Sequence, residues 1–218
     1  MDTYAAVLSR RSIRKFLKND VPPELMKRVM SAAIWAPSSA NRQPWRFYVA
    51  TGSKRNELIQ AMIEATGPDA PSVQAYDEMV EHIVEEGLKR LGEDITAEMM
   101  LEEIGEEARQ FVRFGSIRFY QAPVVIVVAT PKQMAGSSHQ DIGAGVQNIL
   151  LAAHAEGLAT CWVGLPLMYR ERIMEVLAIP EDEVLMSFVC LGYPDKDSPI
   201  NKMHRVRMPF DQIVHLRN

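Results

Sequence analysis

Apolar residues along this chain recur at helical spacing in some segments and form short unbroken runs in others. Spacings of three and four residues predict helices, and short unbroken apolar runs predict buried strands. The predicted helices are Asp2–Ser9, a run that begins at Pro22 and Pro23 and ends at Pro37, Glu57–Ala65, Asp141–Gly157 and Met168–Ala178; the predicted strands are Trp45–Ala50, Val124–Thr130, Thr160–Gly164 and Leu185–Gly192, with a last extended piece at Asp211–Leu216. Because the strands alternate with helices of varied length and no internal repeat is visible, we expect a mixed α/β fold of the α+β type, a sheet covered by helices.

Local signals mark several helix ends. Asp2 and Asp141 each stand at the start of a predicted helix, where a carboxylate can accept hydrogen bonds from the first backbone amides. Gly157 stands where the second of these helices should stop, since glycine readily adopts the left-handed conformation of a helix C-terminus. Gly143 and Gly145 lack the third glycine and the later acid of a dinucleotide-binding turn, so we interpret them as positions for close helix packing.

The segment 66–115 differs from the rest of the chain. It opens with glycine and prolines and then becomes helical in pattern and rich in glutamate. Apolar residues between Val73 and Leu88 keep helical spacing, and Met99–Phe114 predicts a second helix. We interpret residues 1–218 as a single domain that carries this segment as a helical insertion, either a lid over a site or plain packing.

The composition is that of an ordinary globular protein, with 47% hydrophobic and 24% charged residues among 218. Cys161 and Cys190 are too few for a disulfide framework, which favours a reducing compartment. No secretory signal is visible, and the longest apolar run, Ala122–Ala129, is far too short to span a membrane. The composition therefore predicts a soluble, cytoplasmic protein.

Charge is distributed unevenly along the chain. Residues 1–60 hold eleven Lys or Arg against four Asp or Glu, and the tail from Ile200 holds four bases and one acid. Residues 64–107 hold fourteen acids against two bases. A nucleic-acid-binding protein is more often basic overall. Basic ends that converge in space would suit a small phosphorylated ligand, whereas separate ends would simply be solvated faces.

Several common catalytic and metal-binding motifs are missing from the sequence. The five histidines are scattered, with no HExxH and no paired CxxC, so we predict no metal site. The sequence has no GxSxG motif and no P-loop. Cys161 has no evident histidine partner in the sequence, which argues against a thiol nucleophile.

Three polar segments remain as candidate binding sites. In the first, Arg10, Arg11, Ser12 and Arg14 offer guanidiniums and a hydroxyl that can bind phosphate oxygens, and in an extended segment alternate side chains point the same way. The second, APSSANRQPW at 36–45, is a stiff loop whose hydroxyl and amide groups can hydrogen-bond a polar ring edge or a ribityl chain. In the third, GLATCWVGLP at 157–166, a strand ends in a turn whose backbone amides can approach a flat ligand.

Along the chain the motifs occur in the order RRSIR, then PSSANRQPW, then the predicted helix 141–157 followed by TCWVGLP, and then LGYP. In this order, and over nearly the whole chain, the sequence resembles the flavin-dependent nitroreductase family. The resemblance implies that family's fold, a central antiparallel-rich sheet covered by helices, here with a helical insertion.

The resemblance also implies a cofactor and an assembly. Family members bind FMN tightly but not covalently, and they are homodimers whose two flavin sites lie at the interface and take residues from both subunits. By motif match, the phosphate and the pyrimidine side of the flavin would be held by Arg10, Arg11, Ser12 and Arg14, with Arg205 and Arg207 reaching the phosphate; Pro37, Ser38, Ser39 and Asn41 would come from the partner subunit, and Val163, Gly164 and Leu165 would lie beside the reactive ring. The two basic ends would then meet at one anionic cofactor.

The family's chemistry implies a function. NADH or NADPH donates a hydride to the flavin, and the reduced flavin then reduces a nitroaromatic, a quinone or a similar small acceptor by two electrons, in a ping-pong mechanism. Because the flavin carries this chemistry, no catalytic side chain is expected. Relatives that deiodinate tyrosines carry a Glu-x-x-x-Tyr element, and Tyr76 does not stand four residues after a glutamate, which argues against deiodination. Flavin fragmentation, which other relatives perform, stays an alternative.

Two further classes of function stay open from the sequence. The first is a flavin or nucleotide binder without activity, because no residue is visibly dedicated to acid–base work. The second is a nucleic-acid-associated protein that uses the basic N-terminal segment, although the acidic middle of the chain argues against it.

Overall fold

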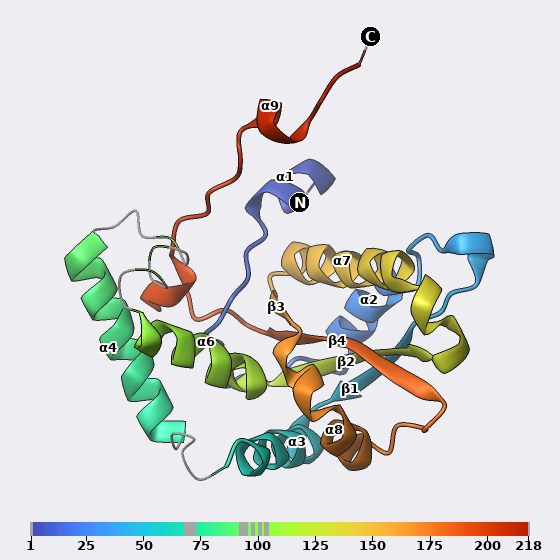
Figure 1. The fold of residues 1–218 in the computed structure, drawn as a ribbon, viewed down its shortest axis with the longest axis horizontal. Coiled ribbons are helices and arrows are strands. Elements are labelled where there is room, and N and C mark those ends of the chain that lie inside the picture. The colour runs from blue at the N-terminus through green and yellow to red at the C-terminus, as the bar shows by residue number, and fades with distance from the viewer. Residues whose placement is uncertain are drawn as a thin grey trace.

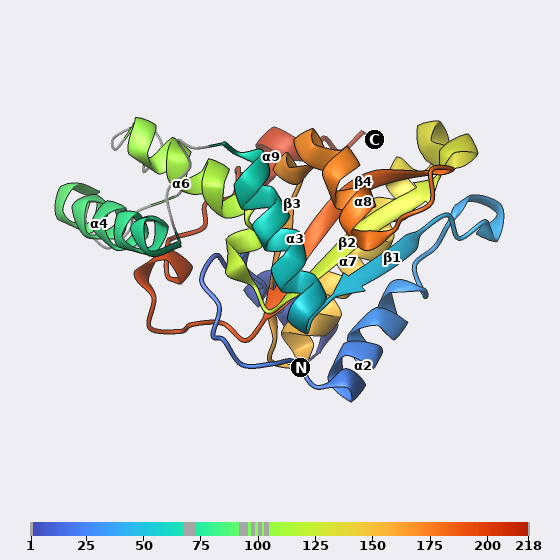
Figure 2. The same cartoon turned by 90° about the horizontal axis from the view of Figure 1, so that it is seen from below.

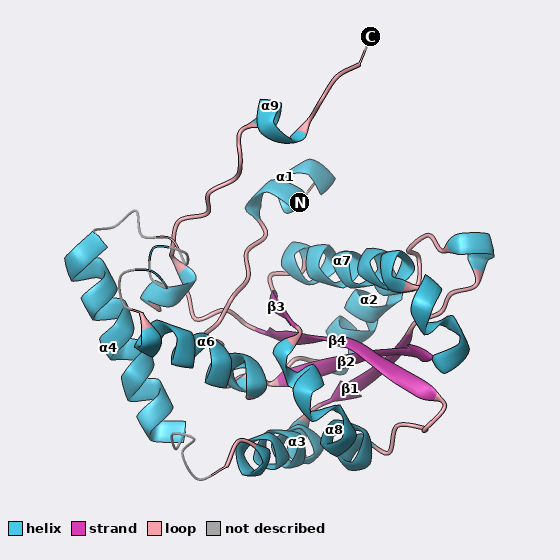
Figure 3. Ribbon diagram, viewed as in Figure 1, coloured by secondary structure: helices cyan, strands magenta, loops and turns pink. Residues whose placement is uncertain are grey.

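Four antiparallel strands form one sheet in the part of the chain that the computed structural model describes, namely residues 2–67, 73–91, 96, 99, 102 and 105–217. Their order across the sheet is β1 (Arg46–Ala50), β2 (Val124–Pro131), β4 (Glu183–Gly192) and β3 (Ala159–Val163). Each neighbouring pair is antiparallel, and helices cover both faces (Figure 3). The predicted α+β fold with an antiparallel-rich sheet is confirmed.

The central strand β2 divides the hydrophobic core into two layers. Side chains alternate between the two faces of a strand, so Ile126 packs against α2 (Pro23–Ala33) and α7 (His139–Ala155) on one face. Val127 packs on the other face against α3 (Gly52–Ala65) and α8 (Arg170–Leu177). Figures 1 and 2 show these two helix pairs on opposite sides of the sheet. The unbroken apolar run of β2 is explained by burial on both sides.

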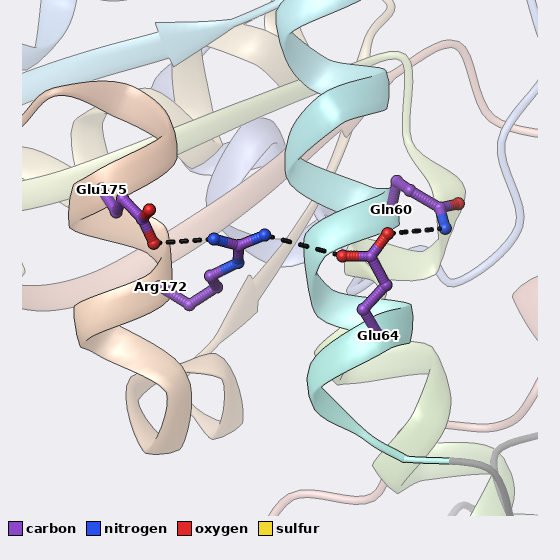
Figure 4. Close-up of polar contacts among 4 residues, drawn as sticks. All are labelled: Gln60, Glu64, Arg172 and Glu175. Carbon is purple, nitrogen blue, oxygen red and sulfur yellow. Dashed lines mark hydrogen bonds and ion pairs between the residues drawn. The ribbon is translucent and has the colours of Figure 1, made fainter.

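Polar contacts also join α3 to α8 at the edge of this core (Figure 4). The Arg172 guanidinium lies 3.6 Å from a carboxylate oxygen of Glu64 and donates a hydrogen bond of 2.7 Å to Glu175. Gln60 donates to the same Glu64 carboxylate at 3.1 Å. All four side chains lie near solvent, so this network adds little to stability.

The helical insertion packs into the core through its inner face. Its helices α4 (Val73–Leu91) and α6 (Glu106–Ile117) meet at Tyr76 and Phe111, whose rings are stacked with centroids 6.0 Å apart. Tyr76 belongs to the same buried cluster as the sheet residue Val127. The first part of the predicted helix Met99–Phe114 lies largely outside the described residues, and α6 continues to Ile117 rather than ending at Phe114.

Helix boundaries confirm some predicted signals and correct others. The Asp2 carboxylate accepts a hydrogen bond of 3.0 Å from the Ala5 amide and caps α1 (Thr3–Ser9), and Gly157 follows α7 with a φ of +77°, so both predictions are confirmed. Asp141 is not a cap, because α7 begins two residues earlier and Asp141 lies in its first turn. Close packing does not require glycine at Gly143 or Gly145, because a Cβ added at either position would meet no atom closer than 3.6 Å.

The chain after β4 departs from the prediction in one place. The expected extended piece Asp211–Leu216 starts within a short helix, α9 (Phe210–Ile213), which follows Pro209 directly and has Asp211 in its first turn, whereas Val214 is extended as predicted. Figure 1 shows this tail rising beside α1 and away from the sheet. Short 3₁₀ helices complete the described structure: η1 (Ser39–Asn41), η2 (Phe119–Gln121), η3 (Lys132–Ser137), η4 (Leu165–Tyr169) and η5 (Pro199–Asn201).

Candidate functional site

A cavity of about 270 Å³ lies where the N-terminal and C-terminal segments meet, and we call it the arginine cavity. Ser12, His204 and Asn201 contribute to its wall together with five arginines. These are Arg10, Arg11, Arg14, Arg205 and Arg207. The structure therefore brings the two basic ends of the sequence into one cavity.

The N-terminal wall is held in place by the sheet. Ser12 forms an isolated parallel bridge with Thr160 of β3, and the amide of Ile13 donates a hydrogen bond of 2.9 Å to the carbonyl of Thr160. Ile13 is buried in the core, whereas Ser12 lines the cavity. Ser12 and Ile13 thus point to opposite sides, as extended backbone requires, but Arg11 lines the cavity together with Arg10, Ser12 and Arg14, so the strict alternation predicted for RRSIR is not kept.

Asn201 joins the two walls of the cavity. Its side-chain oxygen accepts a hydrogen bond of 2.9 Å from the Arg14 amide, and its side-chain nitrogen donates to the carbonyls of Lys15 and Asp195, each at 2.8 Å. Asn201 is buried, so these bonds satisfy a polar group that would otherwise be costly to bury. Our sequence analysis missed Asn201, because nothing in the sequence marks this asparagine as buried.

Two arginines bind backbone carbonyls across the same junction. The Arg205 guanidinium donates to the carbonyls of Arg10 and Leu8, the latter at 2.9 Å. The Arg11 guanidinium donates to the carbonyl of Met203. Because these bonds run between segments almost two hundred residues apart, they hold the cavity together while leaving part of each cation exposed to it.

The electrostatics of the arginine cavity favour an anion. No carboxylate is among its lining residues, and within the described part of the chain none of its five arginines forms an ion pair with an acid. Burial, followed by the nearby Arg207, lowers the pKa of Arg10. Burial, followed by repulsion from Arg11, Arg207 and Arg10, lowers the pKa of Arg205. Like charges gathered in this way are stabilised by a bound counter-charge.

Arg14 occupies a special position in the wall. Its Nε is buried and has no hydrogen-bond partner, an unusual state for a charged group. Burial alone would lower the pKa of Arg14, but Tyr120, Cys161 and Tyr76 nearby together outweigh that effect and the pKa is raised. A buried donor without a partner is what an acceptor atom of a bound ligand would satisfy.

His154 lies at the rim of this region and was not singled out in the sequence. It belongs to the last turn of α7, and its Nε2 lies 2.7 Å from the Ser9 hydroxyl. Burial, followed by the charges of Arg10 and Arg205, lowers the pKa of His154. The positive potential of the arginine cavity therefore reaches the end of α7.

The serine-rich loop lies elsewhere in the same chain. Pro37, Ser38, Ser39 and Asn41 surround η1, and the Ser39 amide donates to the Asp141 carboxylate at 3.3 Å, in the first turn of α7. The arginine cavity is adjacent to the opposite end of α7, at His154. Thirteen helical residues span about 20 Å, so one chain does not unite these two predicted groups.

The third predicted group also lies outside the cavity wall. Val163 ends β3, and Gly164 and Leu165 follow it at the start of η4. Val163 lies three residues along the strand from Thr160, which corresponds to about 10 Å. The turn is thus next to the arginine cavity along β3 without lining it. Trp162 beside it is 44% exposed.

Comparison with known proteins decides the family. The sequence profile of the Nitroreductase family matches residues 7–193. The chain belongs to the nitroreductase family. This match confirms the resemblance drawn from the ordered motifs, and with it the expectation that the protein is an oxidoreductase of this family.

Relatives within the nitroreductase family cover nearly the whole chain. The sequence is 31% identical over 213 residues to the chloronitrobenzene nitroreductase of Comamonas testosteroni, covering 95% of this chain and 93% of that one. It is 24% identical to the 5,6-dimethylbenzimidazole synthase of Rhodospirillum rubrum, covering 90% and 84% of the two chains. The fold matches the crystal structure of the FMN-dependent nitroreductase NfnB from Mycobacterium smegmatis in complex with NADPH, with a TM-score of 0.78, 24% identity and coverage of 99% and 97%.

The described helices include none that is both long enough and apolar enough to cross a membrane.

Proposed function

We propose that this nitroreductase-family protein is an FMN-dependent NAD(P)H oxidoreductase that reduces nitroaromatics, quinones or similar small electrophiles by two electrons. The observation that carries the proposal is the arginine cavity, which gathers five guanidiniums without a carboxylate among its lining residues. A phosphate monoester with a polar ring system supplies both a counter-charge for the arginines and an acceptor for the buried Nε of Arg14.

The cavity residues divide naturally between the two ends of such a ligand. Arg10, Arg11, Arg205 and Arg207 would hold the phosphate, with the Ser12 hydroxyl as a further donor. Arg14 would donate to a ring or ribityl oxygen, which satisfies its buried nitrogen. FMN bound there supplies hydride transfer between a pyridine nucleotide and an electron acceptor.

The chain's own part is to bind and to orient. Asn201 and the bridge from Ser12 to Thr160 fix the wall, so the guanidiniums are set before a ligand arrives. The turn at Val163, Gly164 and Leu165 would present backbone amides beside the ring, since it follows β3 directly. We expect no side-chain nucleophile or general base in this mechanism.

A homodimer would complete the site. Large apolar side chains of the described chain lie exposed at its tail and near the serine-rich loop: Phe210 is 64%, Leu216 79% and Trp35 84% exposed. The exposed surface of 12444 Å² exceeds the roughly 10,000 Å² of a compact monomer of 24.6 kDa. Exposed apolar side chains of this size suit an interface between subunits. In a dimer, Pro37, Ser38, Ser39 and Asn41 of one subunit would reach the arginine cavity of the other.

The test combines an absorption spectrum with a reduction experiment. Protein purified with excess FMN and desalted should keep a flavin absorption band, and anaerobic NADH or NADPH should bleach it. Menadione or nitrofurazone should then restore the band, and sedimentation should give a dimer. Protein that retains no FMN would refute the proposal.

Flavin fragmentation is the second candidate, favoured by the similarity to 5,6-dimethylbenzimidazole synthase. Mass spectrometry of the small molecules after aerobic incubation of the reduced protein separates the two. Intact FMN over many turnovers supports the oxidoreductase, whereas stoichiometric conversion of FMN to a benzimidazole supports fragmentation. A band that bleaches but drives no turnover with any acceptor would favour a flavin binder without activity.

A further inference from the structure

A second cavity, of about 420 Å³, lies on the other side of Arg14, and we call it the α3 cavity. Its wall is formed by the segment 14–20, the start of α3, the inner face of α4 and the turn η2. Arg14 lines both cavities, and the other lining residues differ. A volume of this size accepts a small organic ligand rather than a single ion.

One half of the α3 cavity is cationic. Arg14, Lys15, Lys18 and Arg55 line it, and Asp20 is the single carboxylate among its lining residues. The excess of positive charge favours an anion, as in the arginine cavity. No residue of the serine-rich loop or of the turn after β3 contributes to this wall, so it is a separate site.

Arg55 is fixed rather than mobile. Its Nε donates a hydrogen bond of 2.7 Å to the carbonyl of Ala122, a second nitrogen donates to the carbonyl of Gln121, and a third donates to the Asn56 side chain at 2.9 Å. Burial lowers the pKa of Arg55, yet it remains a cation at any ordinary pH. A cation held by neutral carbonyls keeps its charge available to a ligand.

The other half of the α3 cavity is aromatic. Phe16, Tyr76 and Tyr120 line it together with Val80. The two tyrosines sit close against α6, because a Cβ added at Gly115 would lie 2.2 Å from the Tyr76 hydroxyl and 2.4 Å from the Tyr120 ring. Gly115 therefore sets the position of this aromatic wall. A ligand that contacts both the cationic and the aromatic half of the cavity needs a flat apolar body and a negative group at one end.

From this juxtaposition we infer that the α3 cavity binds a small aromatic carboxylate, whose ring lies against Tyr76 and Tyr120 and whose carboxylate faces Lys18 and Arg55. Neither a bare inorganic anion nor a neutral ring uses both halves of the wall. Because Arg14 also lines the arginine cavity, the occupant shares one cation with any anion bound there. Binding at the α3 cavity should therefore weaken anion binding at the arginine cavity.

The experiment is calorimetric titration of the protein with benzoate, and separately with benzamide and with inorganic phosphate, each with and without added FMN. Saturable binding of benzoate, weaker at high salt and absent for benzamide, is the expected result. Equal binding of benzoate and benzamide, or binding of phosphate in place of benzoate, would overturn the inference. Because benzoate is measured also without FMN, a failure to bind FMN leaves this test intact.

Substitutions place the binding in the α3 cavity. Lys18→Gln removes one exposed cation of the wall and should weaken benzoate about two- to five-fold. Asn56→Asp keeps the side-chain shape, pairs with Arg55 and repels the ligand, so affinity should fall about tenfold or more. Lys54→Gln, which removes an equal charge from α3 outside the wall, should leave benzoate affinity unchanged. Unaltered affinity in both cavity variants, with an unchanged melting temperature, would contradict the assignment.

Discussion

The core around β2 and the arginine cavity are stabilised in opposite ways. Ile126 and Val127 are fully buried on the two faces of the sheet, and their neighbours are apolar. Burial, followed by neighbouring like charges, lowers the pKa of both Arg10 and Arg205. The chain stabilises its core with its own side chains, whereas the arginine cavity is built for a charge that the chain does not supply.

This difference has a thermodynamic consequence. A ligand that binds only the folded state raises stability by an amount set by its concentration and affinity. Changes in the core should therefore alter the stability of the protein with or without a ligand. Changes in the arginine cavity should alter mainly the stabilisation that the ligand adds.

The largest effect is expected in the core. Phe188 on β4 is fully buried, with its ring centroid 5.5 Å from that of Phe119. Phe188→Ala should lower the free energy of unfolding by about 3–5 kcal/mol, measured by urea denaturation, because it leaves a cavity. The loss should be equal with and without FMN. The exposed change Gln212→Ala is the control, and a loss below 1 kcal/mol for Phe188→Ala would contradict the picture of a tightly packed core.

A smaller effect is expected where the LGYP motif closes the core. A Cβ at Gly192 would lie 2.6 Å from the ring of Pro123 and 3.3 Å from that of Phe16. Gly192→Ala should therefore cost about 1–3 kcal/mol of stability, since the proline ring cannot move aside easily. Gly143→Ala is the matched control, because an added Cβ there meets only the Trp162 ring, at 4.0 Å. Equal stability of the two variants would show that Pro123 does move.

Substitutions in the arginine cavity should lower FMN affinity without lowering the stability of the FMN-free protein. Arg207→Ala should weaken FMN binding about tenfold, seen by equilibrium dialysis, because a charge-assisted contact to phosphate is lost. Without FMN the melting temperature should stay the same or rise slightly, since Arg207 repels Arg10 and Arg205. Arg217→Ala removes a charge from the same tail outside the cavity wall and should leave FMN affinity unchanged. Unchanged flavin occupancy in Arg207→Ala would refute the role given to this arginine.

The smallest effect is a pH dependence at His154. Its pKa lies below the ordinary value of 6.5, so as the pH falls through that value the unfolded chain takes up a proton before the folded chain does. The stability that neutral His154 contributes is complete above pH 6.5 and is lost as the pH falls through its lower folded pKa.

Thermal melts of the FMN-free protein between pH 7.5 and 5.5 check this expectation. The melting temperature of the wild type should fall more than that of His154→Gln, and the difference should be small because His154 is partly exposed. FMN should reduce the difference, because its phosphate offsets the charges of Arg10 and Arg205. Identical pH profiles of the two proteins would contradict the coupling.

The sequence predicted the strands and the family because those signals are local or ordered along the chain. The run at Val124–Thr130 is apolar at every position, and the structure buries it on both faces. Asn201 could not be predicted, because its role depends on carbonyls that only the fold brings near it. The helix start at His139 instead of Asp141 has a similar cause: the Asp141 carboxylate is bonded to the distant Ser39 amide.

The α3 cavity was also beyond the reach of sequence patterns. Arg55 looks like an exposed residue of an amphipathic helix, and only the carbonyls of Gln121 and Ala122 turn it into a fixed cation. Gly115 carries no motif, yet two tyrosine rings depend on its missing side chain. Close approaches of this kind join segments that are far apart in the chain.

The junction of the chain's two ends has a consequence for biosynthesis. Arg205 and Arg207 leave the ribosome only after β4, the last strand of the described sheet, so the strands can pair while the arginine cavity is still missing one wall. If FMN occupies the arginine cavity, as we propose, its binding is then a late event, and a chain that ends soon after Gly192 should retain no FMN.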